Sequence, residues 1–279
     1  MTNTTNTTLI ALPQLVRLTD PGVRERLEAL PASTALIGIG ADGQALAIDL
    51  EAEGHILVCT ATGGGSTTLL RTLTAQFLHQ GDHALVLDPT RISHLWATDL
   101  PTVTHRGNIA GIHEALLGLA TELRRRLDLN GDLDGVPNLT VLLEQGDATV
   151  RQLNSYWEKF RQSSDPKTSP AIAALNDVLY FGRAAHIHVF FHTQANARVL
   201  GPGARDFFTT KILGRVSAAT WQTIAPEVSP APKSSKHSGR AHVVRNCTVQ
   251  ETQILTLTDA EARDLAATNT DTLGEPEAI

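Results

Sequence analysis

The segment 55–73, "HILVCTATGGGSTTLLRTL", constrains the fold more than any other part of the chain. An apolar run, "ILVC", is typical of a strand buried on both faces of a parallel sheet. Three consecutive glycines follow, and leucines then recur at helical spacing. This order of strand, glycine turn and helix is the layout of a loop that binds phosphate through backbone N–H groups at a helix N-terminus. The segment therefore predicts an α/β fold.

Other apolar runs extend this prediction to a whole sheet. Strands buried on both faces alternate with helical patterns, which indicates a mainly parallel sheet with helices on both of its faces. A hairpin with an Asp-Gly turn precedes the glycine turn, and further strands follow near the C-terminus. The segments concerned are the hairpin 35–50, the strands 83–88, 138–145 and 186–193, and the C-terminal strands 241–257.

The glycine turn matches the P-loop pattern only in part. That pattern is Gly, four residues of any kind, Gly, Lys, then Ser or Thr. Aligned with "TATGGGST", Thr60 replaces the first glycine, Ser66 replaces the lysine, and Thr67 keeps the hydroxyl that would hold Mg²⁺. The candidate nucleotide-binding residues are Thr62, Gly63, Gly64, Gly65, Ser66, Thr67 and Thr68. The segment alone leaves two interpretations open, a phosphate loop without its cation or a tight turn that glycines permit.

Polar residues at the ends of two later strands are the next candidates. Glu144 ends the strand "LTVLL" at the place of an acid that would help to hold Mg²⁺, together with Thr67. Gln145 stands where a water-activating glutamate would be expected, and a glutamine cannot take a proton from water at neutral pH. Gln194 follows the strand "HIHVFFHT" and is a candidate sensor of a terminal phosphate. For each residue the alternative is an ordinary polar strand end.

Taken together, these segments resemble the motor domain of FtsK/SpoIIIE-type DNA translocases, in particular the TraB-like transfer proteins of bacterial plasmids and integrative elements. The resemblance spans about residues 36–266. It implies a RecA-like P-loop NTPase core, ATP with Mg²⁺, a ring assembly and transport of double-stranded DNA. It also implies that Arg183, in "GRAAHIH", either faces a neighbouring subunit's nucleotide or is structural. The chain departs from the family again at Thr90, which replaces a lysine.

These departures all fall where the family handles nucleotide, whereas the strands keep their apolar pattern. We therefore predict a pseudo-ATPase, an assembly or DNA-transfer-associated subunit with a degenerate Walker A (Ser66) and Walker B (Gln145). Binding of ATP or ADP with Mg²⁺ is expected to be weak or absent. Two alternatives stay open: an active ATP-dependent translocase of double-stranded DNA, and a silent subunit of a mixed ring or filament beside an active relative.

Charge gives no general sign of nucleic-acid binding, because the net charge is −6. A basic stretch, "PKSSKHSGR", nevertheless collects Lys233, Lys236 and Arg240 near one loop. It predicts either a contact with DNA phosphates or an ordinary solvated loop.

The organisation of the chain follows from these segments. We expect an N-terminal tail and short helix over 1–30, an FtsK-like RecA-type domain over 31–267 and a disordered acidic tail over 268–279. The N-terminus is a poor signal peptide, and no run approaches the roughly 20 apolar residues of a membrane span. Cys59 and Cys247 are expected to be reduced and buried. These features predict a cytoplasmic protein.

Overall fold

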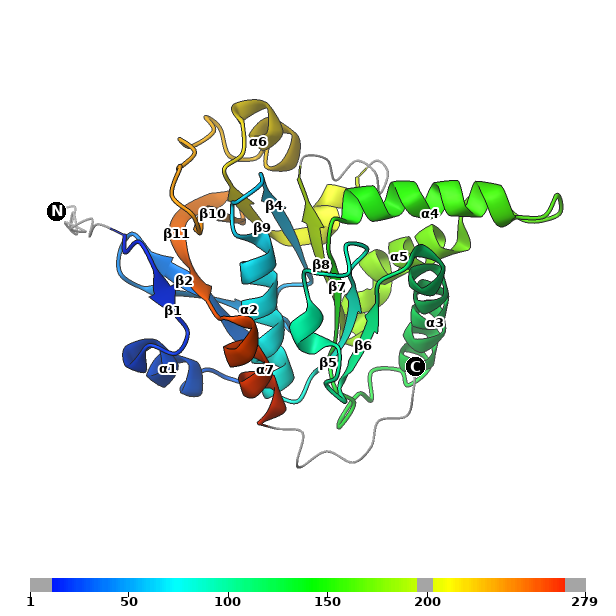
Figure 1. Ribbon diagram of the computed structural model, residues 1–279, viewed down its shortest axis with the longest axis horizontal. Helices are drawn as coiled ribbons and strands as arrows, with labels where there is room; N and C mark the ends of the chain where they lie inside the picture. The colour runs from blue at the N-terminus through cyan, green and yellow to red at the C-terminus, as the bar shows by residue number, and fades with distance from the viewer. Residues whose placement is uncertain (1–11, 195–202, 269–279) are drawn as a thin grey trace.

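The computed structural model describes residues 12–194 and 203–268 (Figure 1). These residues form an 11-stranded sheet with the order β3-β2-β11-β10-β9-β4-β8-β7-β5-β6, and β1 pairs with β11. The strands are β1 (Val16–Arg17), β2 (Thr34–Gly40), β3 (Ala45–Asp49), β4 (His55–Thr60), β5 (His83–Leu87), β6 (Val103–Arg106), β7 (Leu139–Leu143), β8 (Ile187–Thr193), β9 (Phe208–Gly214), β10 (Arg240–Arg245) and β11 (Thr248–Thr256).

Helices cover both faces of this sheet. The α-helices are α1 (Pro21–Glu28), α2 (Ser66–His79), α3 (Ile109–Leu127), α4 (Gly146–Phe160), α5 (Pro170–Phe181), α6 (Ala218–Ile224) and α7 (Asp259–Ala267). Short 3₁₀ helices occur as η1 (Leu95–Ala97), η2 (Gly182–Ala185) and η4 (Ala204–Phe207). In Figure 1, α2 and α7 lie together on one side, whereas α3 and α5 lie on the other and α4 projects outward.

The sheet has two halves with different strand directions. Strands β9, β4, β8, β7, β5 and β6 are mutually parallel, so their carboxyl ends meet at one edge. Strands β10, β11, β2 and β3 add an antiparallel half, which includes the predicted hairpin. The predicted α/β class, with a mainly parallel core sheet and helices on both faces, is therefore confirmed.

The two faces of the central strand explain why its sequence is apolar throughout. Ile56 and Val58 of β4 pack into one core with Phe77 of α2. Leu57 and Cys59 point to the other face and pack into a second core with helices α3 and α5. Alternate residues of a strand point to opposite faces, so a strand covered on both sides must be apolar at every position.

Several expectations about the chain's periphery have a direct outcome. Cys59 is buried, but Cys247 is exposed in the turn between β10 and β11, so the prediction that both are buried was wrong for Cys247. Among the described residues, no helix combines the length and the apolar character that crossing a membrane requires. The domain boundaries stay predictions, and residues 1–11 and 269–279 of the predicted tails lie outside the described residues.

Candidate nucleotide site

The glycine turn joins β4 to α2 at the carboxyl edge of the parallel strands. Gly63 has φ 74° and Gly65 has φ 97°, a left-handed backbone that glycine adopts readily. A Cβ atom placed on Gly64 would lie 2.8 Å from Cβ of Thr60. The turn therefore needs glycine for its shape, and the predicted strand–turn–helix order is correct.

Thr60 lies directly beneath this turn at the position of the missing first glycine. Thr60 is only 3% exposed. Its hydroxyl Oγ1 has no hydrogen-bond partner among the described residues, and it lies 3.2 Å from the Cβ position of Gly64. Buried polar atoms are rarely left unpaired, so this hydroxyl marks a place where the turn is polar and incompletely satisfied.

A basic side chain that the sequence analysis did not select lies against the same turn. Arg215 follows the last residue of β9, the strand that pairs with β4. A Cβ atom placed on Gly63 would lie 3.0 Å from Nη1 of Arg215. The signal for this residue was its position directly after an apolar strand, at the edge where parallel strands end together.

The segment before β10 holds Arg215 in this position. Nη2 of Arg215 donates to the backbone oxygen of Lys236 and to Oγ of Ser238. Gly239 approaches the turn itself, since its Cα lies 3.5 Å from the Cβ position of Gly65. The predicted basic loop thus packs beside the phosphate-type turn, although the two are far apart in sequence.

The three basic residues of that loop have different environments. Lys233 and Lys236 are exposed. Arg240 lies in β10, where its guanidinium donates to Gln253 and to the backbone oxygen of Pro13. Its Nη1 also lies 3.8 Å from a carboxylate oxygen of Glu251. The guanidinium of Arg240 is therefore bound within the protein, and a role in DNA contact stays a prediction.

Glu144 follows β7 at the same edge of the sheet, but its side chain is enclosed by other residues. It is 2% exposed. Oε2 accepts a hydrogen bond from Nε2 of His94 at 2.8 Å, and Oε1 accepts one from Nδ1 of His192 at 2.5 Å. Burial acts to raise the pKa of Glu144, but the hydrogen bonds from His192 and His94 outweigh it and lower the pKa to about 2.

The proton positions in this His94–Glu144–His192 cluster follow from the other contacts. Nδ1 of His94 accepts from the indole N–H of Trp96 at 3.4 Å, so Nε2 carries the proton that is donated to Glu144. On His192, Nδ1 lies 2.5 Å from Oε1 of Glu144 and 3.4 Å from the backbone N of Gln145. The shorter contact assigns the proton to Nδ1, because an ionised carboxylate only accepts. Nε2 of His192 is buried and has no hydrogen-bond partner among the described residues.

Asp88, after β5, explains how His94 is brought to Glu144. Its buried carboxylate accepts from the backbone N–H groups of Thr90 at 3.1 Å and Ser93 at 2.8 Å, and more weakly from that of His94. The hydroxyl of Thr90 also donates to Asp88. Thr90 therefore closes a turn at the position where the resembled family has a lysine.

Gln145 begins α4 in a conformation that is unusual for its type. Its φ and ψ are both 48°, in the left-handed region. The following Gly146 is packed tightly, because a Cβ atom placed there would lie 2.4 Å from Cε2 of Phe191. The backbone at the end of β7 is thus fixed, and the half-buried Gln145 occupies the place predicted for a water-activating glutamate.

Two further predicted residues lie at opposite ends of the parallel strands. Gln194 is exposed directly after β8, at the same edge. Arg183 lies in η2, before β8, and its Cδ is 3.6 Å from the Cβ position of Gly54, which precedes β4. Because β4 and β8 are parallel, Arg183 and the turn of the same chain are at opposite ends of the strands.

The residues of this edge do not form a metal-binding group. In the ranges 12–194 and 203–268, no cluster of three or more His, Cys, Asp or Glu side chains has an arrangement that could hold a metal ion. Both carboxylate oxygens of Glu144 already accept hydrogen bonds from histidines. One acceptor site on each oxygen of Glu144 is therefore already used, and Thr67 and Glu144 as Mg²⁺ ligands stay a prediction.

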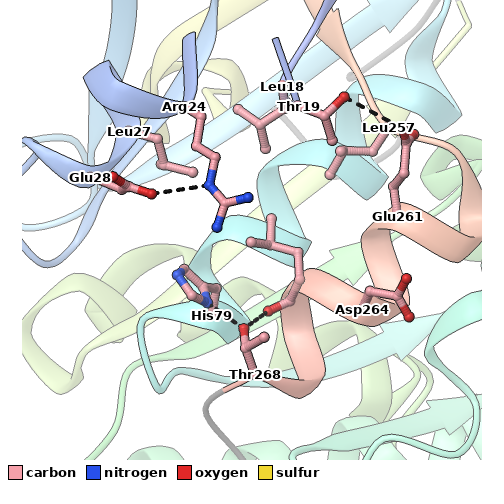
Figure 2. Close-up of a pocket in the computed structure, with 11 residues that line it drawn as sticks. Leu18, Thr19, Arg24, Leu27, Glu28, His79, Leu257, Glu261, Asp264 and Thr268 are labelled. Atoms are coloured by element: carbon pink, nitrogen blue, oxygen red, sulfur yellow. Dashed lines mark hydrogen bonds and ion pairs between the residues drawn. The ribbon is translucent and has the colours of Figure 1, made fainter. Parts of the chain in front are cut away.

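A separate hollow lies at the opposite end of α2 (Figure 2). Figure 2 shows apolar side chains such as Leu27 and Leu257 in it, with Arg24 and Glu28 paired at one side. The pocket measures about 270 Å³, and His79 at the end of α2 lines it. A helix of this length spans roughly 20 Å. This pocket is therefore distinct from the glycine turn.

Comparisons with known proteins agree with the fold. No protein-family model and no curated protein sequence matches the chain. Among solved structures, it is similar to the pCW3 conjugation coupling protein TcpA in its monomer form with ATPγS, with a TM-score of 0.72, 17% identity, and coverage of 91% of this chain and 74% of TcpA.

Two secretion ATPases are similar as well. EssC (ATPases 2 and 3) from Geobacillus thermodenitrificans has a TM-score of 0.68 and 15% identity, over 92% of this chain and 51% of EssC. The cytoplasmic domain of the type VII secretion ATPase EccC from Thermomonospora curvata has a TM-score of 0.65 and 14% identity, over 88% of this chain and 28% of EccC. The chain thus spans about half of that EssC structure and under a third of that EccC structure.

The predicted resemblance is confirmed at the level of structure. The neighbours are ATPases of the FtsK/SpoIIIE-like conjugation and secretion group, and the chain shares their P-loop NTPase fold. At these identities the likeness concerns the fold alone.

Proposed function

We propose that this chain is a pseudo-ATPase. It binds the polyphosphate of a nucleotide weakly at the glycine turn, does not hydrolyse it at a useful rate, and acts as an assembly or DNA-transfer-associated subunit. The observation that carries the proposal is the enclosure of Glu144. Both oxygens of this carboxylate, at the place of the metal-holding acid, accept hydrogen bonds from buried histidines.

The chemistry of hydrolysis supports the same proposal. Turnover needs a group that orients or deprotonates water and a cation that neutralises charge on the transferred phosphoryl group. Gln145 cannot deprotonate water, and Ser66 carries no charge. One such electrostatic contact is typically worth ~3 kcal/mol of transition-state stabilisation. Losing the general base alone slows turnover by about 10²- to 10⁴-fold relative to an enzyme that has it.

Phosphate binding is a separate matter, and the residues of the turn fit it. Gly63 and Gly65 keep the left-handed backbone of a phosphate loop, and a Cβ on Gly64 would fill space that the turn requires. The N-terminus of α2 supplies backbone N–H groups and the positive end of the helix dipole. Because both oxygens of Glu144 are bonded to histidines, we expect the nucleotide to be held through these groups without a metal ion.

The kind of assembly is suggested by the neighbours. TcpA is a conjugation coupling protein, and EccC is a secretion ATPase. By analogy, this chain would work beside a transfer machine as a self-assembled ring or filament, or as a silent subunit of a mixed ring with an active relative. Arg183, at the opposite end of the strands from the turn, would then face the neighbouring subunit's site.

Steady-state ATP hydrolysis, measured with and without double-stranded DNA, tests the proposal. We expect no turnover above the blank, against a median enzyme turnover of roughly 10 s⁻¹. DNA-stimulated turnover at that rate would show an active translocase instead. The double variant Ser66→Lys with Gln145→Glu is the informative companion, because residual inactivity there would isolate the effect of the enclosed Glu144.

Light scattering after size exclusion tests the assembly. A mass that rises with protein concentration supports self-assembly. A lone monomer at all concentrations removes the self-assembled ring and leaves the mixed ring, which then requires co-purification with an active relative.

A further inference from the structure

We infer that Arg215 supplies the cation that the glycine turn lost with its lysine, so that the turn and Arg215 together form a binding site for the polyphosphate of a nucleotide. The inference rests on the proposed nucleotide binding at this turn and adds the residue on which the affinity depends. In a P-loop the lysine reaches the β- and γ-phosphates. Ser66 cannot do this, and Arg71, one helical turn further along α2, is paired with Asp259.

The position of Arg215 is the first support. Its Nη1 would be 3.0 Å from a Cβ atom on Gly63, so the guanidinium is in contact distance of the turn. β9 and β4 are parallel neighbours with Gly214 paired to Thr60, which brings the residue after each strand to the same place. Arg215 is therefore delivered to the turn by the sheet register rather than by a flexible loop.

The state of the guanidinium is the second support. Its hydrogen bonds to Lys236 and Ser238 both use Nη2, which leaves Nη1 directed to the turn. Nε is buried and has no hydrogen-bond partner among the described residues. A guanidinium carries five N–H donors, and phosphate oxygens are acceptors that suit it. The side chain is thus fixed in place while part of its donor capacity is unused.

An independent polar atom on the other side of the turn points to the same ligand. Thr60 is buried, and its Oγ1 has no partner in the described part of the chain. This hydroxyl lies against Gly64, whereas Arg215 lies against Gly63. Two polar groups without a partner among the described residues, one on β4 and one directly after β9, therefore converge on one short stretch of backbone at a helix N-terminus. This is the environment of a bound anion.

Arg215 also has a left-handed backbone, with φ 55°. This conformation is unfavourable for a side chain of its size and is retained only where surrounding structure enforces it. The side chain of this residue is held by the loop before β10, through the backbone oxygen of Lys236. The same loop places Gly239 against Gly65, so one segment contacts both Arg215 and the glycine turn.

Isothermal titration of the full chain with inorganic pyrophosphate and with ATP, both in EDTA, tests the inference. We expect Arg215→Gln to weaken binding of both ligands by about 10- to 100-fold, the usual range for losing a hydrogen bond to a charged group. Arg24→Gln, which removes an exposed arginine of α1, is the matched control and should bind as the unaltered chain does. Equal affinity in Arg215→Gln and the unaltered chain would overturn the inference.

A rescue separates charge from structure. Adding Ser66→Lys to Arg215→Gln restores the motif's own cation, and we expect affinity to return to within about threefold of the unaltered chain. If the double variant melts normally but still fails to bind, Arg215 acts through the shape of the turn and the inference is wrong. If a short DNA duplex binds in an Arg215-dependent manner while pyrophosphate and ATP do not, the ligand is a DNA backbone and the inference is also wrong.

These outcomes are distinct from those of the hydrolysis assay. Rapid ATP turnover would remove the pseudo-ATPase proposal while leaving a dependence of binding on Arg215 intact. Unchanged binding in Arg215→Gln, without turnover, would remove the role of Arg215 while leaving the pseudo-ATPase proposal intact.

Discussion

Two regions of the carboxyl edge, the glycine turn and the His94–Glu144–His192 cluster, differ from the resembled family's motifs in opposite ways. At the glycine turn between β4 and α2, the backbone keeps the shape of a phosphate loop, and the inferred cation, Arg215, follows β9. Polar atoms of Thr60 and Arg215 there have no partner in the part of the chain that the structure describes. At the ends of β5, β7 and β8, polar groups bond to each other through Asp88, His94, Glu144 and His192. One side is arranged to receive an anion, whereas the other has become part of the folded core.

This difference separates binding from catalysis in physical terms. Phosphate binding relies largely on backbone N–H groups, which survive substitution of side chains as long as the turn keeps its glycines. Positioning a metal ion and activating water rely on specific carboxylates, which are lost when a single residue changes or finds another partner. A domain can therefore keep the first property after the second has disappeared.

The largest expected effect on stability comes from disrupting the His94–Glu144–His192 cluster. Glu144→Gln replaces a carboxylate that accepts from two N–H donors with an amide whose NH₂ must face one of them. We expect the free energy of unfolding to fall by about 3 kcal/mol, because two hydrogen bonds to a buried carboxylate are lost and one buried N–H is left without an acceptor. Urea unfolding measures it, with the exposed Glu158→Gln on α4 as a control that should change by under about 0.5 kcal/mol. A neutral result for Glu144→Gln would show that the cluster does not contribute to the fold.

The same cluster gives a pH dependence of defined sign. The pKa of Glu144 is lowered from 4.5 to about 2 in the folded chain, so its contribution is complete above about pH 4.5 and is lost as the pH falls through 2. A shift of this size corresponds to about 3 kcal/mol. The difference in urea midpoint between the unaltered chain and Glu144→Gln should therefore shrink from pH 5 to pH 3. A difference that grows on acidification contradicts this sign.

A pair of glycine substitutions compares the two sides directly. In Gly146→Ala, the new Cβ would meet the ring of Phe191 at 2.4 Å, inside a rigid core. In Gly63→Ala, it would meet the end of the flexible Arg215 side chain at 3.0 Å, with strain from φ 74°. We expect Gly146→Ala to lower stability by about 3 kcal/mol, and Gly63→Ala by about 1 kcal/mol together with loss of pyrophosphate binding. The reverse order in thermal melts would mean that the glycine turn is the more rigid side.

The smallest effect on stability is expected from restoring the lysine alone. Ser66→Lys places a cation at the first turn of α2, where the helix dipole disfavours it by a few tenths of a kcal/mol, roughly. Affinity for ATP in EDTA should rise about tenfold, and hydrolysis should stay at the blank because Gln145 and Glu144 are unchanged. Recovery of turnover from this change alone would show that the enclosed side is still functional.

The sequence was sufficient to predict the strands and the glycine turn, but not the side chains that contact the site residues. Continuous apolar strands predicted a sheet covered on both faces, and the glycine turn was located because only glycine allows its backbone. The enclosure of Glu144 could not be predicted from the sequence, because His94 and His192 are about 50 positions from it. The turn at Asp88 brings His94 to Glu144, and the pairing of β8 with β7 brings His192 there. Arg215 was missed for the same reason, since its place depends on the pairing of β9 with β4.

Two interpretations were changed by these long-range contacts. The basic loop was interpreted as a DNA contact or as an ordinary solvated loop, yet its backbone holds Arg215 beside the turn. Thr90 was interpreted as a lost nucleotide contact, and it also makes the turn that delivers His94. A substitution in a motif can therefore be both a loss for catalysis and a gain for the fold.

ATP affinity measured in Mg²⁺ and in EDTA tests most directly whether the two sides have separated as described. If the turn and Arg215 bind the polyphosphate and Glu144 is closed to metal, the two dissociation constants should agree within about threefold. An affinity that is tenfold or more tighter in Mg²⁺, and that is lost in Glu144→Gln, would show a working metal site and contradict the account.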